Sequence, residues 1–167
     1  MIPRVLIAYA SKKGSTREVA QAVADRLEAD GLRTVVQPAS DRVDLLNFDA
    51  VVIGGALYMG RWHRDARQFL HRHRRVLATA RVAVYAMGPT TMDDQSVASS
   101  LKQLEDALAS VPEVAPIAVT IFGGVLDPAR HHFPFNRMPP SDARDWGAIA
   151  AWADEIAAQI PRLEIQA

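Results

Sequence analysis

Short apolar runs alternate along this chain with longer segments in which apolar residues recur every three or four positions. The run Val-Leu-Ile-Ala-Tyr at residues 5–9 is typical of a strand buried on both faces. Val19, Val23 and Leu27 share one face of the helix that we expect next. We expect five strands, at residues 5–9, 33–37, 50–53, 81–87 and 115–122, and about five helical segments, at residues 16–29, 43–46 (a single turn), 62–78, 96–108 and 145–160.

This alternation of strands and helices predicts an α/β fold with a parallel sheet and helices on both of its faces. The chain has 167 residues, enough for one such domain, and a chain of this length buries roughly 70% of its unfolded surface. We expect a single domain over residues 1–160 and a C-terminal tail over residues 161–167.

Composition and charge exclude several classes of function. The chain has no cysteine, which excludes disulfides, thiolate zinc sites, iron–sulfur clusters and a cysteine nucleophile. Its 19 basic and 19 acidic residues cancel, so we expect no general attraction to nucleic acid. No apolar run is long enough to span a membrane and no secretory signal is recognisable, so the expected location is the cytoplasm.

The segment Ser-Lys-Lys-Gly-Ser-Thr at residues 11–16 follows the first strand and opens a helix. Backbone N–H groups and hydroxyls in such a turn lie at the positive end of a helix dipole, where they bind phosphate. Thr16 alone could be a helix cap, but with Ser11 and Gly14 beside it we favour a ligand contact. The sequence lacks G-x-G-x-x-G here, and its lysine precedes the glycine, which disfavours a dinucleotide fold and a nucleotide-hydrolysing loop.

Four strand ends are followed by polar or glycine-containing loops, at residues 11–16, 54–60, 88–91 and 123–125. Loops after parallel strands emerge at the same edge of a sheet, and ligands bind there where the strand order reverses. We therefore expect these four loops to form one ligand site.

With these features, the chain resembles the flavodoxin family over essentially its whole length. The resemblance implies a doubly wound five-stranded sheet of order 2-1-3-4-5 that binds FMN, with the phosphate held by the hydroxyls of Ser11 and Thr16 and by the intervening backbone N–H groups. The residues implied at the cofactor are Ser11, Lys12, Lys13, Gly14, Ser15, Thr16, Ala56, Leu57, Tyr58, Met59, Gly60, Met87, Gly88, Pro89, Thr90, Gly123 and Gly124.

Within that family, residues 51–63, residues 69–73 and the pair Asp145-Trp146 look similar to the flavodoxin-like, menaquinone-dependent protoporphyrinogen oxidases of haem biosynthesis. This resemblance implies an FMN-dependent oxidoreductase that uses a quinone or porphyrin substrate and makes at most peripheral contact with a membrane. The chain departs from that branch at residues 127–140, because oxidases with the established activity carry a longer basic, hydrophobic loop there.

Several alternatives remain open from the sequence. The chain could be a soluble electron shuttle that serves redox partner proteins, although such flavodoxins are usually acidic, or a domain that kept the fold without the flavin. Tyr58 and Trp62 are either flavin-stacking or core residues, and the six arginines of residues 61–75 are either a solvated helix face or an anion-binding patch. His63 is the one histidine to test for proton transfer, although we favour no such role for it, and the aromatic loop at 131–135 leaves a homodimer open. We name no catalytic side chain, because the flavin would carry the redox chemistry.

Overall fold

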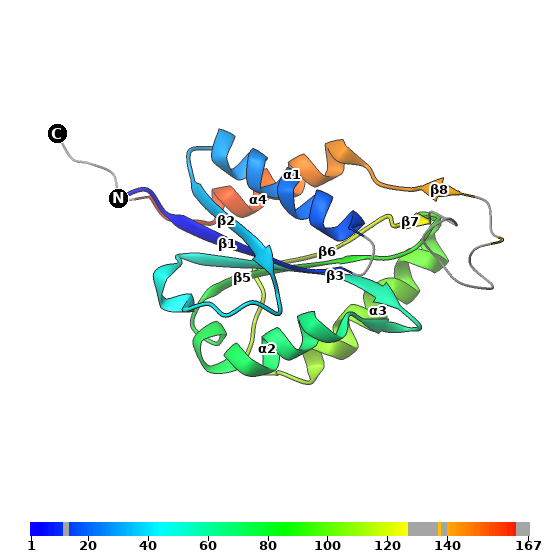
Figure 1. Cartoon of the computed structure of the whole chain (residues 1–167), viewed down its shortest axis with the longest axis horizontal. Coiled ribbons are helices and arrows are strands. Elements are labelled where there is room, and N and C mark those ends of the chain that lie inside the picture. The colour runs from blue at the N-terminus through cyan, green and yellow to red at the C-terminus, as the bar shows by residue number, and fades with distance from the viewer. Residues whose placement is uncertain (12–13, 127–136, 138–139, 163–167) are drawn as a thin grey trace.

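The computed structural model describes residues 1–11, 14–126, 137 and 140–162 (Figure 1). Lys12 and Lys13, most of the 127–140 loop, including its aromatic segment, and the tail from residue 163 lie outside the described residues. The main strands are β1 (Arg4–Ala10), β2 (Arg33–Pro38), β3 (Ala50–Tyr58), β5 (Arg81–Met87) and β6 (Ala118–Phe122). The helices are α1 (Ser15–Ala29), α2 (Arg64–Leu77), α3 (Asp94–Ala109), α4 (Trp146–Ala158) and the 3-10 turn η1 (Leu45–Asn47), and the short strands are β4 (Arg61–Trp62), β7 (Val125–Leu126) and β8 (Ser141–Asp142).

The five main strands form a parallel sheet in the order β2-β1-β3-β5-β6. This is the predicted order, with two additions. Strand β4 pairs with β3 in an antiparallel hairpin, and β7 pairs with β8 in a separate two-stranded sheet. The order reverses at β1, since β2 lies on one side of it and β3 on the other, which puts a ligand crevice at the carboxyl ends of β1 and β3.

The helices cover both faces of the sheet (Figure 1). Val5 and Ile7 of β1 pack with α1 and α4, whereas Leu6 and Ala8 pack with α2 and α3. All four are 0% exposed, which explains why β1 is an uninterrupted apolar run rather than an alternating one. No helix in the described part of the chain is long and apolar enough to cross a membrane.

The prediction that β3 ends at Gly54 and Gly55 is wrong, because the strand continues to Tyr58. Both glycines lie inside the strand, where neighbouring side chains take the space of a Cβ atom. A Cβ at Gly54 would lie 1.9 Å from Cζ of Tyr85, and one at Gly55 would lie 2.7 Å from Nε1 of Trp62. These glycines allow close packing across the sheet rather than terminating a strand.

The predicted start of the second long helix at Trp62 is also wrong. Trp62 belongs to β4, and α2 begins at Arg64 because His63 caps it: Nδ1 of His63 accepts a hydrogen bond from the Asp65 backbone N–H at 3.0 Å. The other helix and strand ends differ from the expected ones by a few residues.

Candidate ligand site at the carboxyl edge of the sheet

A cavity of about 100 Å³, which we call the loop cavity, lies at the carboxyl ends of the parallel strands. All four loops that the sequence singled out contribute to it. Its lining residues are Ser11, Ser15, Ala56, Leu57, Tyr58, His63, Met87, Gly88, Gly124 and Val125. Of these, His63 and Val125 are not among the residues implied at the cofactor, although Val125 lies in the predicted 123–125 loop and His63 is the histidine considered for proton transfer.

The first wall of the loop cavity is the turn that opens α1. Gly14 adopts the left-handed conformation, with φ of 90°, and its backbone N–H donates to Oγ of Ser11 at 2.9 Å. The helix has no side-chain N-cap, so the interpretation of Thr16 as a cap is wrong. Thr16 is fully buried in the first turn, and its Oγ1 has no hydrogen-bond partner among the described residues.

This turn fits a phosphate group. A buried hydroxyl without a partner carries a desolvation cost of about 1–3 kcal/mol, which a phosphoryl oxygen would remove. The exposed N–H groups of the first helical turn and the positive end of the α1 dipole favour an anion at the same place. Ser15 and Thr16 therefore have the donor groups that phosphate requires, whereas the Gly14 N–H already donates to Ser11, and Lys12 and Lys13 are outside the described residues.

The second wall is the β3–β4 hairpin. Met59 and Gly60 form its two-residue turn with φ of 50° and 80°, the signs of a type I′ turn. Tyr58 lines the loop cavity and is 46% exposed, so its ring remains a candidate for stacking on a flat ligand. Met59 is 76% exposed, and neither Met59 nor Gly60 lines the loop cavity.

Trp62 lies on the other side of this hairpin and is a core residue. It is 1% exposed, and its Nε1–H donates to the backbone oxygen of Gly55 at 3.0 Å. Its ring therefore fixes β4 against β3, which answers the open alternative between core and stacking for this residue.

His63 lines the loop cavity, but Nδ1 is already an acceptor for the cap of α2, which places the proton of the neutral ring on Nε2.

The third and fourth walls are the loops after β5 and β6, which touch through their backbones. The Gly88 N–H donates to the Phe122 oxygen at 2.9 Å, and the Gly124 N–H donates to the Pro89 oxygen at 2.9 Å. A Cβ at Gly124 would lie 2.6 Å from the Gly88 oxygen, so this contact needs glycine. Pro89 and Thr90 do not line the loop cavity.

Gly123 has a structural reason to be glycine. A Cβ there would lie 2.0 Å from the Ala143 oxygen, in the segment that follows β8. Arg144 holds this segment against α1, because its guanidinium pairs with Asp142 at 2.8 Å and also with Glu18. The hydrogen bonds from Arg144 lower the pKa of the Asp142 carboxyl. No spacing of residues along the chain predicts this connection.

A comparison with known proteins identifies the class. Residues 6–137 match the model of a flavodoxin domain family, and the chain belongs to that family. No curated protein matches the chain.

Solved structures share the fold. Oxidised flavodoxin 1 of Bacillus cereus matches with a TM-score of 0.63 and 16% identity, covering 95% of this chain and 99% of that one. Oxidised flavodoxin 2 of the same organism matches with a TM-score of 0.64 and 22% identity, over 93% of this chain and 99% of that one. Rubredoxin oxygen:oxidoreductase of Desulfovibrio gigas matches with a TM-score of 0.61 and 14% identity, over 95% of this chain but 36% of the other.

Proposed function

We propose that this protein binds one FMN non-covalently at the loop cavity and transfers electrons between redox partners. The observation that carries the proposal is the convergence of four separate loops on one cavity, together with the buried, unpartnered hydroxyl of Thr16 in the first turn of α1. Membership of the flavodoxin family and the flavodoxins among the similar structures support it.

Each wall would have a separate task. Ser15, Thr16 and the N–H groups of the first turn of α1 would hold the phosphate. The backbone around Gly88 and Gly124 would offer hydrogen bonds to the edge of the ring system, and Tyr58 would cover one of its flat faces. When bound, FMN supplies reversible electron uptake, and the protein contributes position, shielding from water and electrostatics.

The finer alternative is an oxidase of the protoporphyrinogen oxidase-like branch, which rests on the resemblance at residues 51–63. The arginine side chains of α2 would suit the carboxylates of a porphyrin. Oxidation of protoporphyrinogen with a quinone as acceptor would favour this oxidase. Activity only as a relay between a reductase and an acceptor protein would favour the shuttle. A cytoplasmic location, the absence of nucleic-acid binding, peripheral membrane contact and a homodimer remain predictions.

One observation favours a second candidate, a domain of this fold that holds no flavin. The loop cavity measures about 100 Å³, whereas pockets for small molecules usually measure about 300–1,000 Å³. In the flavin-bound form, much of the ring system would therefore lie outside this cavity, at the exposed rim near Tyr58.

Titration with FMN and with riboflavin tests the proposal. We expect FMN to bind with quenching of its fluorescence, and riboflavin to bind at least about tenfold more weakly because it lacks the phosphate. Equal affinity for the two would contradict the phosphate site at the start of α1. Absence of binding by either, in a folded protein that purifies without colour, would select the domain without flavin.

A further inference from the structure

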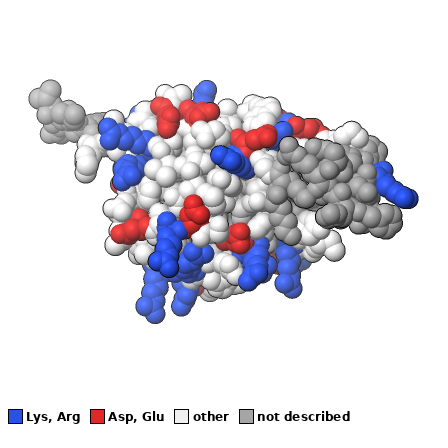
Figure 2. All heavy atoms as spheres, in the orientation of Figure 1, with Lys and Arg blue, Asp and Glu red and all other residues white. Residues whose placement is uncertain are grey.

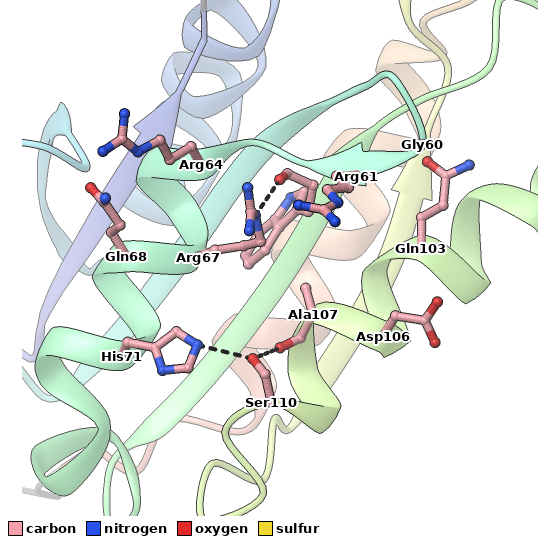
Figure 3. Close-up of a pocket in the computed structure, with 11 residues that line it drawn as sticks. Gly60, Arg61, Arg64, Arg67, Gln68, His71, Gln103, Asp106, Ala107 and Ser110 are labelled. Carbon is pink, nitrogen blue, oxygen red and sulfur yellow. Dashed lines mark hydrogen bonds between the residues drawn. The ribbon is translucent and has the colours of Figure 1, made fainter.

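Another cavity lies away from the loop cavity, between α2 and α3 (Figure 3). It measures about 680 Å³, within the range of pockets that hold small molecules. We call it the arginine groove, and its main polar lining residues are Arg61, Arg64, Arg67, Gln68, His71 and Gln103. The surface around α2 is rich in Lys and Arg, which gather along the lower side of the molecule in Figure 2.

Arg61 and Arg67 both place their guanidinium groups in this groove, and neither is paired with an acidic residue that the structure describes. Figure 3 shows the guanidinium groups of Arg61 and Arg67 between the two helices, with Arg64 at the outer rim. Nε of Arg67 donates to the Trp62 backbone oxygen at 2.9 Å, which fixes that side chain in place. Neither Arg61 nor Arg67 forms a salt bridge with any acid among the residues that the structure describes.

The acid that lines the groove does not compensate this charge. Both carboxylate oxygens of Asp106 lie 3.1 Å from Nζ of Lys102, one turn earlier on α3. The start of α2 adds the positive end of a helix dipole beside Arg61 and Arg64. The potential in the groove is therefore positive, and an anion placed there would be attracted by charges that the protein leaves uncompensated.

The far end of the groove is closed by a hydrogen bond between the two helices. Nε2 of His71 and Oγ of Ser110 are 3.0 Å apart, and Oγ of Ser110 donates to the Ala107 oxygen at 2.6 Å. Since the Ser110 hydroxyl has only one hydrogen to give, it accepts from His71, and Nε2 carries the proton. This bond links α2 to the C-cap of α3, so the two helices are already connected at this end of the groove before any ligand arrives.

We propose that the arginine groove binds a small polyanion, a molecule with two or more carboxylate or phosphate groups, through Arg61 and Arg67. Planar guanidinium groups bind either kind of group through paired hydrogen bonds. Gln68 and Gln103 on opposite rims provide amides for the polar groups between the charges. The site is distinct from the proposed FMN site, because the β3–β4 hairpin separates it from the loop cavity and the two cavities share no lining residue.

The test is a calorimetric titration of the full-length protein with citrate and, separately, with inorganic pyrophosphate at constant ionic strength. We expect saturable binding of at least one probe, and the preferred probe tells a carboxylate ligand from a phosphate ligand. In two-dimensional NMR spectra, the backbone N–H signals of Gly60 and Ser110 should shift together, because these residues line opposite ends of the groove (Figure 3).

Charge variants locate the site. Arg61→Gln should weaken binding, and the double variant Arg61→Gln with Arg67→Gln should weaken it at least about tenfold. The control is Arg72→Gln with Arg75→Gln, which removes the same charge from α2 outside the groove and should change affinity less than about twofold. Arg61→Gln leaves the hydrogen bond from Arg67 to Trp62 intact. If the double variant folds poorly, this single variant replaces it in the test.

Two results would overturn the proposal. Equal weakening by the groove variant and its control would show diffuse attraction to a basic surface. Failure of both probes to bind would exclude a small polyanion, and binding of an oligoglutamate peptide in their place would make this face a docking surface for an acidic protein.

Discussion

The hydroxyl of Tyr85 donates a hydrogen bond to the backbone oxygen of Thr16 at 3.2 Å, across 69 positions of sequence. Tyr85 is fully buried in strand β5, between β3 and β6, where its ring also contacts Phe122 and Trp152. Burial raises the pKa of its phenol far above the usual value, so the hydroxyl stays protonated and remains a donor at any ordinary pH. The first turn of α1 is thereby held directly by the core of the sheet.

Tyr85→Phe removes this bond while keeping the ring. We expect the free energy of unfolding to fall by about 0.5–1.5 kcal/mol, as for an average buried hydrogen bond. Urea denaturation followed by circular dichroism would measure the change. The matched control is Tyr9→Phe, because the Tyr9 hydroxyl bonds no residue that the structure describes, and an equal loss there would argue against the assigned role of Tyr85.

Thr16→Val keeps the shape of the side chain and removes its unpartnered hydroxyl. The free energy of unfolding of the FMN-free protein should stay the same or rise, since a buried unsatisfied group disappears. Affinity for FMN should fall about tenfold or more through the lost contact to phosphate. Riboflavin is the control ligand, and a similar loss of affinity for riboflavin would mean that Thr16 acts on the ring site instead.

Gly54→Ala should destabilise the protein by about 1–3 kcal/mol, because the new methyl group would overlap the Tyr85 ring. Gly147→Ala is the matched control at an exposed position of α4, where the nearest atom to a new Cβ lies 3.4 Å away. That variant should be neutral or stabilise by up to about 1 kcal/mol through helix propensity. Thermal unfolding of the two variants in parallel would check the prediction, which a small effect of Gly54→Ala would refute.

Met59→Asn should stabilise the β3–β4 hairpin by about 1 kcal/mol, since asparagine adopts positive φ more readily than methionine and Asn-Gly is the preferred type I′ turn. Met92→Asn is the control, because Met92 is also an exposed methionine but has no positive φ. Chemical denaturation of both variants would measure the difference. Equal effects would indicate that loss of the exposed side chain, and not the backbone, decides the outcome.

Asp93 makes the free energy of unfolding depend on pH under acidic conditions. Its carboxylate accepts from the Ser96 backbone N–H at 2.9 Å and from the Thr91 hydroxyl at 2.7 Å, which lowers its pKa from 3.8 to about 2. A folded-state pKa below the unfolded value means that the stabilisation is complete above pH 4 and is lost as the pH falls towards 2.

Asp93→Asn isolates this effect, because asparagine still caps α3 but carries no charge. The difference in unfolding free energy between the natural protein and this variant should shrink between pH 4 and pH 2. An NMR titration of the Asp93 carboxyl carbon should give the lowered pKa directly. A midpoint near 3.8 would contradict the role of the three hydrogen bonds at this cap.

The strand order is implied by the resemblance to the flavodoxin family. The parallel sheet with helices on both faces could be predicted from the sequence itself, because a strand such as β1 is buried on both faces, so Leu6 and Ile7 are both apolar although they face opposite helices. The residue at which β3 ends could not be predicted from the sequence. A glycine that ends a strand and a glycine that admits a neighbouring ring look alike in sequence, and the neighbour that decides at Gly54 is Tyr85, on the adjacent strand.

The loops of the candidate site could likewise be predicted, because each one follows a parallel strand and the topology brings them together. Whether a single side chain within these loops points into the site or into the core could not be predicted. From the sequence, Trp62 could be either a core residue or a ligand contact. It is a core residue because its indole N–H bonds the Gly55 oxygen across the hairpin, a contact that the sequence does not reveal. The arginine groove was visible only as a run of cations, because its second wall comes from α3, some 40 positions later.

The extension of β3 beyond the end of the sheet makes one short hairpin a partition between two chambers, with Tyr58 facing one and Arg61 the other. A ligand in either chamber would contact the same four-residue arm, residues 58–61. Thermodynamic linkage then requires any influence of one ligand on the other to be mutual: the factor by which one occupant alters the affinity of the other must be the same in both directions.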